Sequence, residues 1–89
     1  MKIKDGFRLR TLLGQHIVTA EGMAQINFNK LVSLNESAAF LWQKVEGREF
    51  SVQDLADALV EEYGIDAETA LRDSGVIAQK WIDAGLVEK

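Results

Sequence analysis

Helix start and stop signals divide the second half of this proline-free sequence, and they leave little freedom in how it can fold. Asparagine, serine and aspartate cap the first turn of a helix, and glycine accepts the left-handed backbone that ends one. The starts and stops alternate in chain order: Asn35 and Gly47, Ser51 and Gly64, Asp66 and Gly85. We therefore predict three helices between residues 35 and 85.

The first two predicted helices each carry one apolar stripe. Apolar residues recur every three or four positions, which is typical of a helix with a single buried face. The stripes are Ala38, Leu41, Trp42 and Val45 in the first helix, and Val52, Leu55, Ala56, Leu59 and Tyr63 in the second. Ser51 and Asp54 have the spacing of a capping box, which strengthens the predicted start of the second helix.

The third predicted helix carries two neighbouring stripes instead of one. We expect the first, which contains Leu71, Gly75, Ala78 and Ile82, to face the core. The second contains Ala70, Ser74, Ile77 and Trp81. It either packs into the core as well, because the domain is small, or forms the wall of a groove.

The first third of the sequence has the alternation of β-strands. Phe7 to Leu13 and His16 to Ala20 flank Gly14-Gln15 and predict a hairpin, Met23 to Asn29 alternates weakly, and Leu31 to Leu34 is a third short strand. We predict an α+β fold in one domain over residues 1–89. A small N-terminal three-stranded antiparallel sheet is followed by three helices, in a shape like a winged helix-turn-helix.

Composition excludes several kinds of protein. At 47% hydrophobic and 27% charged residues the chain has the balance of a globular domain. It has no cysteine, so disulfides, thiolate zinc sites and iron–sulfur clusters are excluded. No stretch resembles a signal peptide or approaches the ~20 apolar residues of a membrane span. We expect a cytoplasmic protein without a membrane partner.

The residues that enzymes use are sparse and scattered. His16 is the only histidine, and it lies in a predicted strand with no cysteine or second histidine to form a metal site. Acidic pairs such as Glu61-Glu62 lie where a solvated helix face is expected, and the glycines form no phosphate-binding loop. We predict that the chain is not an enzyme and needs no metal or cofactor.

The winged-helix shape raises the question of nucleic acid, and the charge argues against it. The net charge is −4, and the second predicted helix carries Asp54, Asp57, Glu61 and Glu62 but no base. Nucleic-acid binding needs a basic face that neutralises phosphates. We expect no nucleic-acid partner, although a nucleic-acid-binding winged helix stays open as an alternative function.

Residues 31–88 resemble the PqqD-like family. The matching features are Leu34-Asn35-Glu36 with Ala39, Trp42 and Gly47, then Leu55, Leu59 and Tyr63 before Ile65-Asp66, and finally Gly85-Leu86-Val87. The resemblance implies a recognition element for ribosomally made and post-translationally modified peptides. Such a domain is a non-catalytic adaptor that binds the leader segment of a precursor peptide and presents the peptide to a modifying enzyme, often a radical S-adenosylmethionine enzyme.

The resemblance also implies where the peptide binds. In the family the leader adds as an extra strand beside the third strand and lies against the third helix. Here the corresponding peptide-binding residues are Lys30, Leu31, Val32, Ser33 and Leu34 with Ala70, Ser74, Ile77 and Trp81.

Physical reasoning agrees with a binding edge, because an unpaired edge strand offers backbone groups to another chain. The same edge can instead pair with a second copy, so a self-associating module or homodimer stays open. Lys30, Arg8 and Arg10 either steer an acidic leader or are simply solvated.

Overall fold

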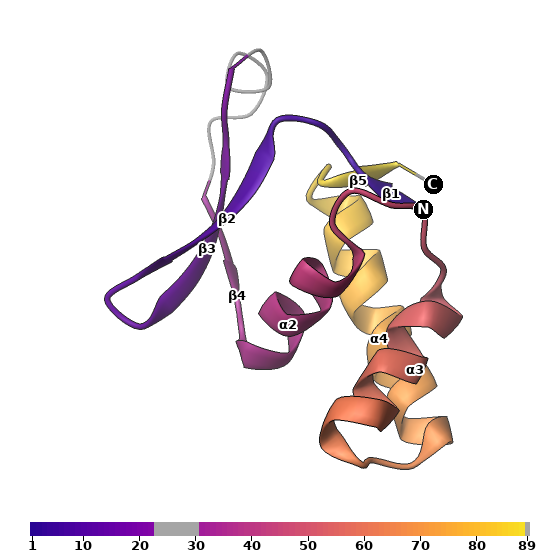
Figure 1. The fold of residues 1–89 in the computed structure, drawn as a ribbon. Coiled ribbons are helices and arrows are strands. Elements are labelled where there is room, and N and C mark those ends of the chain that lie inside the picture. Colours follow the sequence, from indigo (N-terminus) through magenta and orange to yellow (C-terminus); the bar gives the residue numbers. More distant parts are fainter. Residues whose placement is uncertain (23–30, 89) are drawn as a thin grey trace.

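The computed structural model describes residues 1–22 and 31–88 and has a three-stranded antiparallel sheet followed by three helices (Figure 1). The strands are β2 (Phe7–Leu12), β3 (Gln15–Ala20) and β4 (Val32–Leu34), in the order β2-β3-β4. The helices are α2 (Glu36–Val45), α3 (Val52–Tyr63) and α4 (Ala67–Asp83). This arrangement confirms the predicted fold class.

All three predicted helix caps are present. The Asn35 side chain accepts a hydrogen bond from the Ala38 backbone N–H at 2.9 Å, and Asp66 accepts one from the Thr69 N–H at 3.0 Å. At the start of α3, Ser51 and Asp54 bond each other's backbone N–H in a complete capping box. Each cap satisfies backbone donors that the helix itself leaves without an acceptor, and so fixes where the helix begins.

The C-terminal end of α4 leads into a second, smaller sheet that the sequence analysis did not predict. Gly85 takes a positive φ of 79°, and the Leu86 N–H bonds to the Trp81 carbonyl at 2.9 Å, as in a Schellman motif. The chain then forms β5 (Val87–Glu88), which pairs antiparallel with β1 (Lys2–Ile3). Two-residue strands are too short to give a period-2 signal, which explains why sequence patterning misses them.

The β2–β3 hairpin turns at Leu13-Gly14, one residue earlier than predicted. Both residues have positive φ, 52° for Leu13 and 78° for Gly14, as a type I′ turn requires. Glycine adopts this conformation freely, whereas leucine does so at a steric cost. The turn therefore places a strained and fully exposed leucine at the tip of the hairpin.

The core lies mainly among the helices and against one face of the sheet. The Trp42 and Trp81 rings meet edge to face at 5.5 Å between their centroids, and Phe50 packs on Trp81 in the same way at 6.2 Å. Val18 and Phe7 are the residues of the three-stranded sheet that are buried in this core. A membrane crossing would need a longer or more apolar helix than any that the described residues form.

One expectation about the core is wrong. Leu71 was assigned to the core stripe of α4, but 46% of its surface is exposed. The buried face of α4 instead follows Ala70, Ser74, Ala78 and Trp81. Small residues occupy most of this face because α4 packs closely against α3, and Leu71 lies about 100° around the helix from Ala70.

Candidate functional site

Strand β4 lies at an edge of the three-stranded sheet. It pairs with β3 on one side, with Val32 opposite Val18 and Leu34 opposite His16. Within the described residues, no strand pairs with its other side. Backbone N–H and C=O groups that point away from β3 are therefore open to another extended chain.

A cavity of about 140 Å³ lies between this open edge and α4, and we call it the β4–α4 groove. Its lining comes from β4, from the start of α2 and from the C-terminal half of α4. The lining residues are Val32, Ser33, Leu34, Asn35, Ala38, Ile77, Lys80 and Trp81. All but three are apolar, and Lys80 is the one charged residue among them, so the groove has an apolar floor with a cation at its rim.

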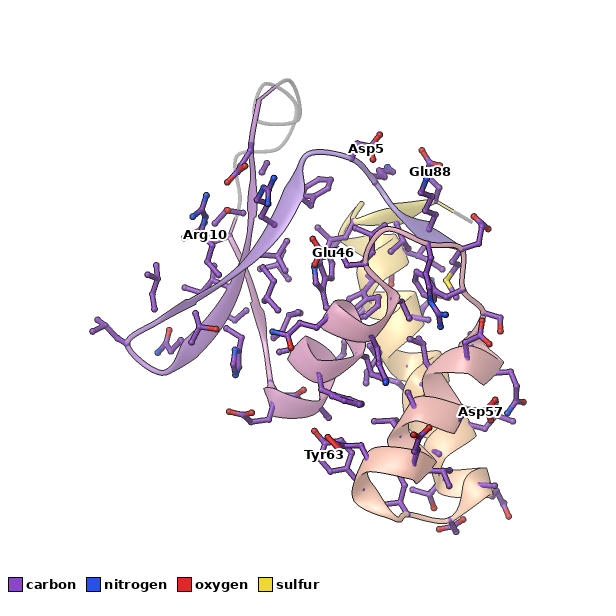
Figure 2. The ribbon with its side chains drawn as sticks, viewed as in Figure 1. Asp5, Arg10, Glu46, Asp57, Tyr63 and Glu88 are labelled. Atoms are coloured by element: carbon purple, nitrogen blue, oxygen red, sulfur yellow. The ribbon has the colours of Figure 1, made fainter. Side chains whose placement is uncertain are left out.

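Two further cavities share residues with the groove. One, of about 360 Å³, lies beside the hairpin turn and shares Ser33, Leu34 and Asn35 with it. The other, of about 260 Å³, lies between α2, α3 and α4 and shares Ile77. Tyr63, labelled in Figure 2, belongs to this last cavity and packs edge to face on Phe40. Both cavities therefore adjoin the groove.

The structure brings together five of the nine residues predicted from the sequence as peptide-binding. Those that line the groove are Val32, Ser33, Leu34, Ile77 and Trp81. Leu31 immediately precedes β4 and is 70% exposed. Lys30, like the weakly alternating segment 23–29, lies outside the described residues. The peptide-binding role of the whole set stays a prediction.

Ala70 and Ser74 are fully buried in the core and do not line the groove. The Ser74 hydroxyl has no hydrogen-bond partner within the described residues. The second stripe of α4 therefore serves two purposes along its length. Its first half packs into the core, and Ile77 and Trp81 in its second half reach the groove.

Sequence reasoning missed Asn35, Ala38 and Lys80 as groove residues. Helical spacing could have found Lys80, which lies three positions after Ile77 and so shares a helix face with a residue already assigned to the site. Asn35 and Ala38 lie one turn apart at the start of α2, where no residue had been assigned to the site.

The charged side chains near the sheet fall into two groups. On the outer face, Arg8 and Arg10 both pair with Glu21, and Figure 2 shows Arg10 pointing away from the helices. Strand β3 separates them from β4, so neither lines the groove. Beside the groove, His16 lies between Thr11 and Glu36, with 3.2 Å from its Nε2 to the Glu36 carboxylate.

Metal-ligating side chains do not gather at this site. Within the described residues, no three histidine, cysteine, aspartate or glutamate side chains are grouped closely enough to hold a metal ion.

Comparison with known proteins supports the fold and places the chain in a family. The solved structure of TbiB1 in complex with the TbiA(beta) leader peptide is similar, with a TM-score of 0.75 and 19% sequence identity. The match covers 99% of this chain and 95% of TbiB1. No curated protein matches the sequence significantly. The family model described as coenzyme PQQ synthesis protein D matches residues 15–87, and the chain therefore belongs to the PqqD family.

Proposed function

We propose that this chain is a non-catalytic adaptor that binds the leader segment of a ribosomally made precursor peptide and presents the peptide to a modifying enzyme. The leader adds as a strand along the open edge of β4, and its side chains enter the β4–α4 groove. The observation that carries the proposal is the coincidence of an unpaired strand edge with an apolar cavity beside it. Peptides that extend a sheet use the edge for affinity and such pockets for specificity.

The rigidity of the site favours binding at low entropic cost. Asn35 caps α2 immediately after β4 ends, so a helix fixes the end of the strand. Trp81 is buried by Trp42 and Phe50, which holds the groove floor in place. A site that is ordered before binding loses little conformational freedom when the peptide arrives.

Two comparisons support the same function. The chain belongs to the PqqD family, and membership in that family implies a leader-binding adaptor. The structurally similar TbiB1 was solved with a leader peptide. The modifying enzyme, which is often a radical S-adenosylmethionine enzyme in such systems, remains part of the proposal. The precursor would be encoded by a short reading frame beside this gene.

The test is a titration of the isotopically labelled domain with the leader peptide encoded nearby. We expect backbone amides of Val32 to Leu34 and the side chain of Ile77 to shift. Ile77→Asp should weaken binding by roughly tenfold or more, because it puts a charge into an apolar groove that the peptide must desolvate. Chemical-shift changes confined to the free edge of β2 would contradict the proposed site.

Leu71→Asp is the matched control. Leu71 lies on the same helix as Ile77 but is exposed and lines neither the groove nor a neighbouring cavity. The Leu71→Asp variant should bind the leader with the affinity of the parent domain, and both variants should keep the parent's circular dichroism spectrum. Equal loss of affinity in both variants would show that the effect comes from added charge and not from the groove.

Self-association at the same edge is distinguished by mass. If two copies pair through β4, the dimer persists on dilution and the leader competes with it. If the edge serves the leader alone, the domain without peptide is monomeric throughout a dilution series.

A further inference from the structure

The charges around the groove are segregated along its length. Lys80 lines the β4–α4 groove, Asp73 lines the adjoining cavity that shares Ile77 with the groove, and Glu36 lines the cavity beside the hairpin turn. Within the described residues, neither Lys80 nor Asp73 has an ion-pair partner within 4.0 Å. Glu36 contacts His16, but 87% of its side chain remains exposed.

These three side chains lie at opposite ends of the site. Helix α4 and strand β4 run in opposite directions in Figure 1. Asp73 shares its cavity with Ser37, the second residue of α2, which follows β4. Lys80 lies two turns further along α4, so Lys80 is displaced from Asp73 toward the Val32 end of the strand. Glu36 shares its own cavity with Leu34. The Val32 end of the site is therefore positive, and the Leu34 end is negative.

Resting on the proposed function, we infer that the groove selects an extended peptide of defined charge polarity: acidic toward its C-terminus, and neutral or basic toward its N-terminus. An added strand pairs more favourably when antiparallel to its neighbour. A peptide antiparallel to β4 starts at the Leu34 end, beside Asp73 and Glu36, and finishes at the Val32 end, beside Lys80.

The spacing of three residues on α4 narrows the sequence pattern expected in the peptide. Asp73, Ile77 and Lys80 share one face of α4, with about 10.5 Å of helix rise between the first and the last. Side chains on one face of an extended peptide recur about every 6.6 Å. The peptide thus places an apolar side chain against Ile77 and an acidic side chain two residues later, within reach of the flexible Lys80 ammonium group.

The experiment uses the leader peptide encoded beside the gene and two synthetic variants of it. Both variants keep its alternating apolar residues. One carries glutamates after the apolar anchor and lysines before it, and the other exchanges these charges, so the two have the same composition. Binding is measured by fluorescence anisotropy with the parent domain, with Lys80→Glu and with Lys44→Glu.

Lys44→Glu is the matched control, because Lys44 and Lys80 each lie in the last turn of their helix. Lys44 lines none of the three cavities. The parent domain and Lys44→Glu should prefer the variant with C-terminal glutamates by about tenfold in Kd, a difference that shrinks in high salt. Lys80→Glu should remove or reverse that preference.

The outcomes separate this inference from the function on which it rests. If the natural leader binds at β4 but the two variants bind equally or both fail, the charge polarity is wrong and the adaptor function stands. The same holds if Lys80→Glu and Lys44→Glu behave alike. If the natural leader itself does not bind, the proposed function fails.

Discussion

The helical half of this molecule, α2 to α4, buries more of its side chains than the sheet half, β2 to β4. Each of α2, α3 and α4 has at least four buried residues, whereas β2, β3 and β4 together have only two, Phe7 and Val18. Burial of apolar surface is the main source of folding free energy. The helices therefore supply most of the stability, and the sheet is left free to present an edge.

This division explains where the groove lies. Its floor comes from the helical half, where Trp81 and Ala38 are buried and fixed, and its open side comes from β4. A binding site at the junction can thus combine a rigid wall with unpaired backbone groups.

The largest expected effect tests the helical half. Leu55 on α3 is fully buried, so Leu55→Ala should reduce the free energy of unfolding by about 2–5 kcal/mol, through lost transfer energy and a residual cavity. Leu34→Ala in β4 should cost less, since Leu34 is only partly buried. Chemical denaturation followed by circular dichroism measures both.

Leu71→Ala is the control for leucine removal itself. Because Leu71 is 46% exposed, we expect a cost below about 1 kcal/mol, in contrast to the core truncation that its place in the sequence stripe suggested. If Leu34→Ala destabilised the protein as much as Leu55→Ala, the comparison between the two halves would be wrong.

Local signals in the sequence were enough for the helices. Asn35, Ser51 and Asp66 act within their own first turns, so their capping roles do not depend on the rest of the fold. The edge position of β4 could also be predicted from the sequence. In a sheet whose strands pair in chain order, the last strand before α2 lies at an edge.

The features that were predicted wrongly or missed depend on how helices and strands pack against one another. Leu71 and Ala70 are adjacent, and only the packing of α3 against α4 decides which of them is buried. The pairing of β1 with β5 joins the two ends of the chain, which no local window contains. The place of Lys80 in the groove depends likewise on where α4 lies relative to β4.

A smaller effect tests the sheet half at its most strained residue. Leu13 has a φ of 52°, a conformation that asparagine tolerates better than leucine, and an Asn-Gly pair is favoured in type I′ turns. Leu13→Asn should stabilise the protein by about 0.5–1 kcal/mol, seen as a higher urea midpoint. Leu12→Asn is the control, since it removes a neighbouring exposed leucine that does not have positive φ. A similar gain from both would point to leucine exposure and not to the turn.

The smallest effect concerns the cap of α4, in the helical half. Hydrogen bonds from the Thr69 side chain and then from its backbone N–H lower the pKa of Asp66 below the ordinary 3.8. The folded state therefore binds this proton less readily than the unfolded chain does. The stabilisation is fully present above the ordinary pKa and is lost as the pH falls through the lower, folded value.

Two variants separate this charge effect from capping itself. Asp66→Asn keeps a side-chain oxygen that can accept from the Thr69 N–H but cannot titrate, so its stability should fall less than that of the parent as the pH drops from about 5 to about 2. Thr69→Val keeps the carboxylate and removes the hydroxyl donor, so the Asp66 pKa, read by carboxyl NMR, should move back toward its ordinary value. Unchanged titration in Thr69→Val would mean that the backbone N–H alone holds the carboxylate. The cap of α4 would then owe nothing to the choice of threonine at its third position.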